Sequence, residues 1–387
     1  MEAVLPGVAA LLFLLLALHP FVFYPLSLRR LARRLGTAPA AATAGRPSVA
    51  ICVCAYNEEA CIERKMANLL ELRAKRGQLD ILVYVDGRGD RTAALLEPFA
   101  GVATVVVAPQ RRGKTHGMNL LVAQSTADIV VFTDANVYVD PSAIDALVRA
   151  FEDQSVGCVC GHLIYTNGQE TATAQIGSLY WRLEEQIKRY ESALGAVMGA
   201  DGSLFAVRRR LHAAVPETLI DDMFVSLSIL CDGHRVVRAP DALAYETSVT
   251  VPEEEFRRKI RIACQAFNVH RVLWPRLRQL PAAVVYMYLS HKLLRWLAAF
   301  NLLFAAVLGR NRFGHIGRAR AGALGSGACR VPVTVAFGPL SAATFVLGCR
   351  DPDRPDRRSG RSIAIDARPH LPDMDSGRFD PACGIGR

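Results

Sequence analysis

A short apolar run that ends in an acidic side chain, residues 129–136, constrains the fold more than any other segment. β-Branched and aromatic residues dominate Ile129 to Phe132, which predicts a buried strand. Asp134 follows this strand, and Asn136 offers a second oxygen ligand. In open α/β sheets, ligands bind beyond the carboxyl ends of the strands, and hard cations prefer oxygen ligands. The segment therefore predicts either a simple strand-ending turn or a site for a cation and a phosphate group.

The segments around this strand alternate between apolar strands, polar loops and amphipathic helices. Strands are expected at residues 48–54, 79–85 and 102–107, and each is followed by a polar loop and then a helical pattern. This alternation predicts an α/β fold with a mostly parallel, doubly wound sheet and helices on both faces, within residues 46–280. The polar loops then meet at one edge of the sheet, where a nucleotide would lie.

Local signals also predict where particular elements begin. Asn57 and Asp221 are expected to cap the helices that follow them, and Pro141 is expected in the first turn of another helix. Residues 234–237 and 243–245 are expected to form two separate short strands.

The first residues predict a membrane anchor. Val4 to Leu26 contains no Asp, Glu, Lys or Arg, and the run is long enough to cross a bilayer. We assign residues 1–28 to a transmembrane anchor and 29–45 to a basic linker. The positive-inside rule then places the N-terminus outside and residue 30 onward in the cytoplasm, at the inner membrane. The competing interpretation, a cleaved signal peptide, lacks the basic residues that should precede the apolar run.

Two further regions follow the α/β part. Residues 281–309 are apolar but interrupted by basic side chains, which predicts an interfacial helix that continues into a membrane-embedded one. Residues 310–387 are rich in Arg, Gly and Pro and resemble a poorly ordered tail. The tail holds more than half of the net charge of +10, so the basic balance does not indicate a nucleic-acid partner.

The ten cysteines do not follow the spacing of a zinc site. Cys52 with Cys54, and Cys158 with Cys160, lie two residues apart inside apolar runs, so each pair is expected on one face of a strand. They are expected to be small buried hydrophobic residues in a reducing compartment.

Five polar motifs occur in an order that resembles membrane-anchored family 2 glycosyltransferases with a GT-A fold, similar to synthases of β-linked polysaccharides such as cellulose, hyaluronan and poly-N-acetylglucosamine. Each motif is weak alone, and the resemblance covers about residues 46–280. The motifs are Tyr56-Asn57-Glu58, Asp86-Gly87, Gly113-Lys114 with Asn119, Asp134-Ala135-Asn136, and Ile220-Asp221-Asp222.

The resemblance implies a set of residues that bind the nucleotide sugar. Tyr56 and Glu58 would lie near the base and ribose, and Asp86 would accept a hydrogen bond from uracil. Lys114 would place a positive charge near the diphosphate, as would Arg261, although the surrounding residues 258–262 depart from the Gln-x-x-Arg-Trp motif of processive synthases. Each of these residues also has an alternative, purely structural interpretation as a turn, capping or membrane-surface residue.

The resemblance also implies a metal, Mg²⁺ or Mn²⁺, on Asp134 and Asn136, together with Asp134 as a contact to the nucleotide sugar. Asn136 stands where relatives have a second carboxylate, so one ligand charge is lost. Asp222 would be the general base of an inverting transferase, and Asp201 with Gly202 would lie on the acceptor side.

Gly113-Lys114-Thr115 also resembles the end of a P-loop. That loop requires Gly at position 108, which is Ala in this chain. We therefore expect an enzyme that moves a hexose or N-acetylhexosamine from a UDP-sugar to a hydroxyl of a saccharide or lipid-linked acceptor, with membrane lipid and no nucleic acid as further partners. The alternative is a catalytically inactive GT-A-fold membrane protein that acts as a binding module.

Overall fold

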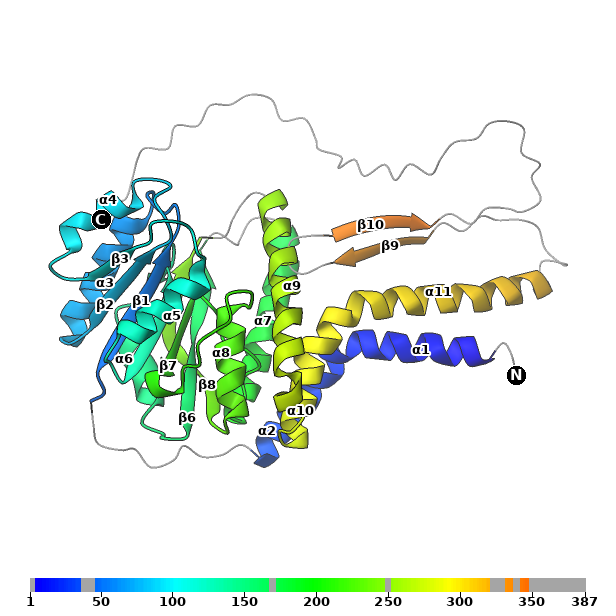
Figure 1. The fold of residues 1–387 in the computed structure, drawn as a ribbon. Coiled ribbons are helices and arrows are strands. Elements are labelled where there is room, and N and C mark those ends of the chain that lie inside the picture. The colour runs from blue at the N-terminus through cyan, green and yellow to red at the C-terminus, as the bar shows by residue number, and fades with distance from the viewer. Residues whose placement is uncertain are drawn as a thin grey trace, which may run out of the picture.

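The computed structural model describes residues 4–35, 46–166, 172–247, 252–320, 331–336 and 342–347. An α/β domain makes up most of the molecule, and two long helices, α1 and α11, project from it side by side (Figure 1). The expected α/β class with a GT-A-like sheet is confirmed.

The domain is built on one eight-stranded sheet with the order β3-β2-β1-β4-β7-β6-β8-β5. Strands β3, β2, β1 and β4 are parallel to one another, β7 is antiparallel to both of its neighbours, β8 is parallel to β6, and β5 is antiparallel to β8. The sheet is therefore mixed, with its parallel half formed by the first βα units. The strands are β1 Val49–Ala55, β2 Asp80–Val85, β3 Thr104–Val107, β4 Ile129–Asp134, β5 Tyr138–Val139, β6 Val156–Tyr165, β7 Leu204–Arg208 and β8 Arg235–Glu246.

Helices cover both faces of this sheet (Figure 1). Helix α4 is extended by a 3₁₀ turn at Glu97–Phe99. The helices of the domain are α3 Ile62–Arg76, α4 Thr92–Leu96, α5 Lys114–Gln124, α6 Ala143–Ala150, α7 Ala172–Ala193, α8 Asp221–Cys231 and α9 Pro252–Leu277.

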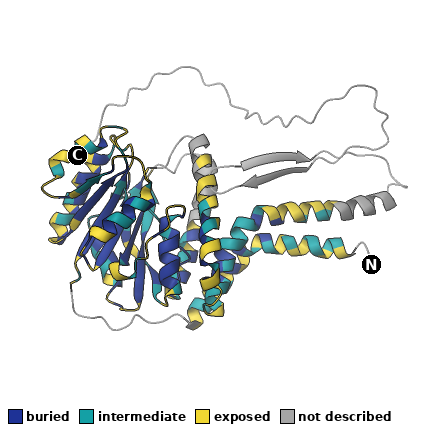
Figure 2. Cartoon of the chain, viewed as in Figure 1, coloured by how far each residue is buried: buried dark blue, intermediate teal, exposed yellow. Residues whose placement is uncertain are grey.

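The central strand β4 shows why its sequence is a continuous apolar run. Ile129 and Val131 belong to the core on the α3 and α6 side, whereas Val130 and Phe132 belong to the core on the α5 and α8 side. Both faces are thus covered, and the four positions from Ile129 to Phe132 are all apolar. Figure 2 shows the strands as the most deeply buried part of the domain.

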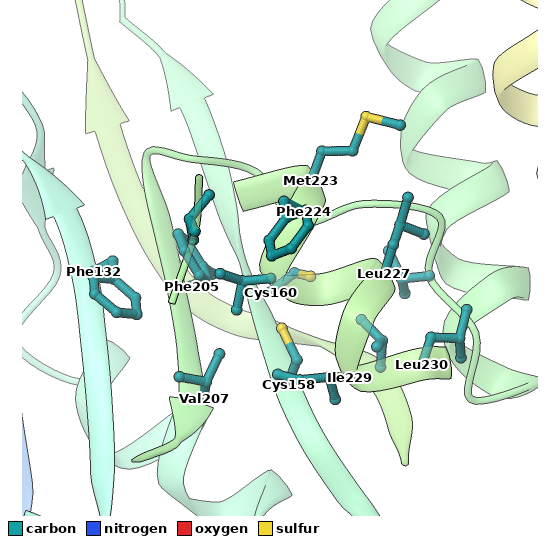
Figure 3. Close-up of a cluster of buried hydrophobic side chains, with 14 of the residues drawn as sticks. Phe132, Cys158, Cys160, Phe205, Val207, Met223, Phe224, Leu227, Ile229 and Leu230 are labelled. Atoms are coloured by element: carbon teal, nitrogen blue, oxygen red, sulfur yellow. The ribbon is translucent and has the colours of Figure 1, made fainter. Parts of the chain in front are cut away.

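The core on the α5 and α8 side of the sheet contains the predicted cysteine pairs. Cys52, Cys158 and Cys160 are all buried in one cluster, and Cys54 packs against it. Figure 3 shows α8 beside β6 and β7, with Phe224 close to Cys160 and Ile229 close to Cys158. This packing fixes the position of the first residues of α8.

Several local expectations were wrong. Helix α3 begins at Ile62, because Asn57 adopts a left-handed conformation (φ 56°) and the chain turns around the carbonyl oxygen of Glu58. Helix α6 begins at Ala143, after Ser142. Residues 235–246 form the single strand β8. The exposed Pro240 lies where the pairing of β8 with β6 shifts register, so the strand continues past the proline.

Two candidate membrane spans extend over residues 5–34 and 282–310, and each has only 11% of its apolar window buried. The first comprises α1 Val4–Leu18, a π-helical turn His19–Phe23, and α2 Tyr24–Leu35, so the basic segment that we expected as a linker begins as a helix. The second comprises α10 Ala282–Tyr288, a π-helical turn Leu289–Leu293, and α11 Leu294–Arg320.

Helices α1 and α11 lie together along their length, with the rings of Phe13 and Phe304 5.3 Å apart (Figure 1). Their outward faces expose large apolar side chains, which fits membrane anchoring. These side chains include Leu5, Val8, Leu11, Leu12, Leu15, Phe300, Leu303, Phe304 and Val307.

The expected tail, residues 310–387, falls largely outside the described residues. Within it, β9 Val331–Ala336 and β10 Ala342–Leu347 form an antiparallel pair.

Candidate active site

Lys114 and two carboxylates meet at the carboxyl edge of the parallel strands. Asp134 ends β4, and Lys114 opens α5. The ammonium nitrogen of Lys114 lies 2.7 Å from Oδ1 of Asp134 and 3.6 Å from Oδ2 of Asp221. Burial would lower the pKa of Lys114, but the two carboxylates outweigh it and hold that pKa well above its usual value. Lys114 is therefore a fixed positive charge at this edge.

The aspartates that open α8 have different surroundings. Asp221 faces Lys114, so the expected capping role is wrong, and Ile220 occupies the N-cap position. Asp222 accepts a hydrogen bond at Oδ1 from the backbone nitrogen of Met223, 2.6 Å away. Burial, and then the neighbouring Asp221, raise the pKa of Asp222 to about 7, while Lys114 opposes the shift. A carboxylate with this pKa can exchange a proton near neutral pH.

The acceptor-side residues from the sequence lie against this carboxylate. A Cβ atom added to Gly202 would come within 2.8 Å of Oδ2 of Asp222, so only glycine leaves this space open. Asp201 lies 3.6 Å from the ammonium nitrogen of Lys188 on α7. The structure thus brings Asp201, Gly202 and Asp222 together. Asp221, the residue before Asp222, contacts Lys114, which in turn contacts Asp134.

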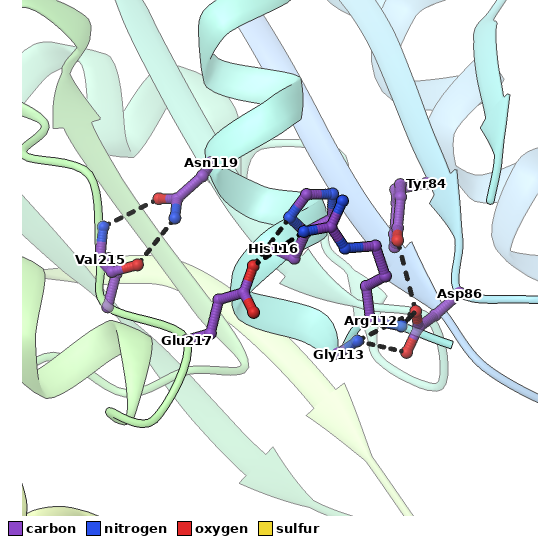
Figure 4. Close-up of polar contacts among 8 residues, drawn as sticks. All are labelled: Tyr84, Asp86, Arg112, Gly113, His116, Asn119, Val215 and Glu217. Atoms are coloured by element: carbon purple, nitrogen blue, oxygen red, sulfur yellow. Dashed lines mark hydrogen bonds and ion pairs between the residues drawn. The ribbon is translucent and has the colours of Figure 1, made fainter. Parts of the chain in front are cut away.

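Asp86 has a role that its motif did not reveal. Its Oδ1 accepts hydrogen bonds from the backbone nitrogens of Arg112 and Gly113, at 2.7 and 3.0 Å, and from the hydroxyl of Tyr84 at 3.3 Å (Figure 4). Asp86 is buried and holds the turn that delivers Lys114. The distance between Asp86 and Arg112 along the chain explains why the motif alone gave no sign of this contact.

Asn119 is likewise committed to the fold. Its amide donates to the carbonyl of Val215 and accepts from the nitrogen of the same residue, at 2.8 and 2.9 Å (Figure 4). Glu217, in the same segment, accepts from Arg112 and pairs with His116. These contacts brace α5 against the segment that leads into α8, so Lys114 and Asp222 are held in a fixed relation.

Tyr56 and Glu58 lie after β1. Tyr56 is exposed, and the guanidinium carbon of Arg111 lies 4.0 Å from its ring centroid. Glu58 accepts a hydrogen bond from the thiol of Cys61, and burial raises the pKa of Glu58. Arg261 is exposed on α9, and no described contact joins it to Lys114 or Asp222.

Two side chains of α3 form hydrogen bonds with the segment that contains Asp134. The buried ammonium of Lys65 donates to the hydroxyl of Thr133 and to the carbonyl of Val137, at 3.1 and 2.6 Å. Burial lowers the pKa of Lys65 to about 7 although Asp134 opposes the shift. Asn68 pairs in the same way with both backbone groups of Val139.

The donor atoms near Asp134 fit a hard cation. The part of the chain that the structure describes contains no cluster of three His, Cys, Asp or Glu side chains that could hold a metal. Asn136 donates its amide nitrogen to Oε1 of Glu246 at 3.1 Å, which leaves its carbonyl oxygen as a ligand atom. One carboxylate and one amide oxygen suit Mg²⁺ or Mn²⁺ when phosphate and water complete the coordination.

Part of this site lies in a segment that matches a sequence family. Residues 50–215 match the glycosyl transferase family 2 profile. Over this range the chain is similar to family 2 glycosyltransferases. Asp134 and Lys114 lie inside the matched range, whereas α8 with Asp222 follows it.

Two relatives of this domain are named for transfer of N-acetylglucosamine. An N-acetylglucosaminyltransferase of Mesorhizobium japonicum is 26% identical over 242 residues, which cover 57% of this chain and 56% of the relative. A poly-β-1,6-N-acetyl-D-glucosamine synthase of Staphylococcus aureus is 26% identical over 206 residues, which cover 51% and 48%. The chain spans about half the length of the curated relatives it matches.

A solved structure shares the fold over most of both chains. The mannosyltransferase PcManGT from Pyrobaculum calidifontis, in complex with GDP-Man and Mn²⁺, superposes with a TM-score of 0.63. The match covers 83% of this chain and 88% of that one at 22% identity, which shows the GT-A fold of the domain.

Proposed function

We propose that this protein is an inverting glycosyltransferase that moves a hexose or N-acetylhexosamine from a UDP-sugar to an acceptor hydroxyl at the cytoplasmic face of a membrane. The observation that carries the proposal is the Asp222 carboxylate, with a pKa of about 7, against the open space at Gly202. Lys114 forms ion pairs with Asp134 and with Asp221, the residue that precedes Asp222. The relatives named N-acetylglucosaminyltransferase support the class of sugar.

In the proposed reaction, the acceptor hydroxyl attacks C1 of the donor sugar while Asp222 takes the hydroxyl proton. The bond between C1 and the diphosphate oxygen breaks, and UDP leaves with the electron pair. Lys114 stabilises the negative charge that develops on the diphosphate. Asp134 and Asn136 would hold Mg²⁺ or Mn²⁺, which supplies further positive charge to the leaving group when bound.

The remaining residues bind the donor or orient these groups. Tyr56 and Glu58 would contact the base and ribose, and Asp86 would keep the Arg112–Lys114 turn in place beside the uracil. Asp201 and Gly202 would bound the acceptor side. Arg261 would contact the diphosphate from α9, although no described contact joins it to Lys114 or Asp222.

The orientation rests on the helices that leave the domain. The last turns of α2 carry Arg29, Arg30, Arg33 and Arg34 on the domain side of the apolar residues. By the positive-inside rule, this side is cytoplasmic.

A nucleotide-release assay tests the proposal. The full chain in phospholipid nanodiscs is supplied with UDP-N-acetylglucosamine, UDP-glucose, UDP-galactose and GDP-mannose in turn, with Mg²⁺ or Mn²⁺. We expect release of UDP from at least one UDP-sugar. A preparation that is folded and binds UDP, yet releases no nucleotide from any donor, would favour the non-catalytic binding module. Release from GDP-mannose alone would overturn the choice of UDP.

A further inference from the structure

A group of charged side chains lies buried between α7 of the domain and the two helix pairs that leave it. Glu191 of α7 accepts hydrogen bonds at Oε1 from the hydroxyl of Tyr24 and at Oε2 from the backbone nitrogen of Met198, at 2.6 and 3.0 Å. His291, in the π-helical turn, lies 2.6 Å from the same carboxylate through Nδ1. One carboxylate thus contacts both membrane-directed segments and the segment that enters the acceptor-side loop.

A second carboxylate completes the group. Glu184 contacts Nε2 of His291 at 3.2 Å and accepts a hydrogen bond from Arg295. Burial would raise the pKa of Glu184, but His291 and Arg295 outweigh it and hold that pKa well below its usual value. His291 thus bridges the two carboxylates, with Nδ1 against Glu191 and Nε2 against Glu184.

The carboxylates of this group have basic partners close by. Arg295 lies against Glu184, His291 lies against both glutamates, and on the same face of α7 Lys188 lies against Asp201. Lys292, which follows His291 in the chain, makes no such contact among the described residues.

Lys292 points toward the acceptor-side loop. A Cβ atom added to Gly199 would lie 3.3 Å from the Lys292 ammonium nitrogen and 3.8 Å from Cγ of Met223. Across the described residues, this ammonium has no hydrogen bond or ion pair, although Lys292 is only partly exposed. Gly199 has φ 99°, a conformation that favours glycine, so the loop leaves room for the ammonium group.

The same loop carries the acceptor side of the catalytic site. Gly202, three residues after Gly199, lies against Asp222, and the backbone nitrogen of Ala200 donates to Ser226 of α8. Two adjacent residues at the start of α8 therefore face the two ends of this short loop. Met223 lies near Gly199, and Asp222 lies against Gly202. A ligand that reaches from Gly199 to Gly202 would meet Lys292 at one end and Asp222 at the other.

The position of Lys292 along its helix indicates what such a ligand is. Phe300, which is exposed on the outward face of α11, lies eight residues beyond it, a rise of about 12 Å along a helix. Lys292 thus lies at the domain end of the exposed apolar surface of α11. A lysine ammonium is a compact charge suited to a single phosphate group.

We propose that Lys292 binds the phosphate group of a membrane lipid that carries the acceptor into the site. The proposal rests on the proposed function for its use of Asp222, but the binding itself requires no turnover. It gives the acceptor a chemical class, a phosphate-bearing lipid whose phosphate lies at Lys292 while the reactive hydroxyl lies at Asp222. The competing role, in which Lys292 only balances the nearby carboxylates, predicts no phosphate binding.

Equilibrium binding of radiolabelled farnesyl monophosphate to the full chain in maltoside micelles tests this. We expect Lys292→Gln to weaken binding by at least about tenfold, because a charge-assisted contact is lost. Lys292→Arg should keep most of the affinity. Arg33→Gln removes an exposed cation from the basic last turn of α2 and should leave binding unchanged.

The comparison ligands are farnesol and inorganic phosphate. Farnesol should bind more weakly than the monophosphate, and its binding should not depend on Lys292. Equal binding of the monophosphate to wild type and Lys292→Gln, or equal affinity for farnesol, would refute the proposal. If inorganic phosphate binds as tightly as the lipid monophosphate, the lipid part contributes nothing to binding, and the proposal of a lipid ligand is refuted.

UDP binding by each variant, measured in parallel, shows that the domain remains folded. Failure of nucleotide release from every donor would remove the proposed reaction and leave this binding result standing. Failure of the binding test alone would leave the reaction standing.

Discussion

Gly202 and Asp222 are packed so closely that a single added methyl group would lie 2.8 Å from the Asp222 carboxylate. Gly202→Ala should displace this carboxylate and reduce kcat by roughly tenfold to a hundredfold, since small misplacements of reacting groups have such effects. UDP affinity should be unchanged. Gly101→Ala, where no atom lies within 4 Å of the added Cβ, is the matched control. Wild-type turnover in Gly202→Ala would place the acceptor elsewhere.

Asp222→Asn removes the proposed base but keeps the size of the side chain. We expect UDP release to fall by about a hundredfold to ten-thousandfold, the usual contribution of a general base. UDP should bind as in wild type, measured by calorimetry on the same preparation. Substantial turnover in this variant would refute the assignment of Asp222.

The pH dependence of kcat/KM should report the ionisation of Asp222. The carboxylate must be deprotonated to act as a base, so the rate should rise with pH and level off above about 7, where the raised pKa lies. Asp221→Asn removes the like charge and should move the inflection to lower pH. Burial, the larger cause, remains, so the inflection should stay above the usual aspartate range. An inflection that does not move would mean that Asp221 has no part in the shift.

Asp86→Ala should destabilise the domain. The backbone nitrogens of Arg112 and Gly113 would lose their acceptor, at a cost of about 1–3 kcal/mol. The thermal midpoint should fall, and KM for the donor should rise because the turn before Lys114 loosens. Asp80→Ala, an exposed aspartate at the start of the same strand, is the control and should change neither quantity.

Removal of divalent metal with a chelator should stop UDP release, and Mg²⁺ or Mn²⁺ should restore it. Asn136→Asp adds a ligand charge and should lower the metal concentration that gives half-maximal rate. It also brings a second carboxylate to Glu246, so Glu246→Gln should be combined with it to remove the repulsion. Full activity in chelator would exclude the metal role of Asp134 and Asn136.

The sequence predicted the parallel half of the sheet well, because strands such as β4 are buried on both faces and carry a continuous apolar signal. It also predicted that Asp134 and Lys114 follow strands, and strand ends in a parallel sheet converge on one edge. The site roles themselves remain predictions.

Other relationships depend on contacts between residues far apart in the chain, which no local pattern encodes. Asp86 holds the backbone of Arg112 across 26 residues, and Glu191 meets His291 across 100. Asp221 was expected to cap its helix, yet Ile220 is the N-cap residue and the Asp221 carboxylate lies 3.6 Å from the ammonium nitrogen of Lys114, more than 100 residues away in the chain.

The contacts of Glu191 have a consequence for the geometry of catalysis. This carboxylate fastens Tyr24 of one membrane-directed helix pair and His291 of the other to the backbone at Met198. In a bilayer spanned by α1 and α11, the height of the acceptor loop above the lipid surface is therefore a constant of the fold. An acceptor must present its reactive oxygen at that one height, so the length of the polar part between lipid and oxygen would itself select among acceptors.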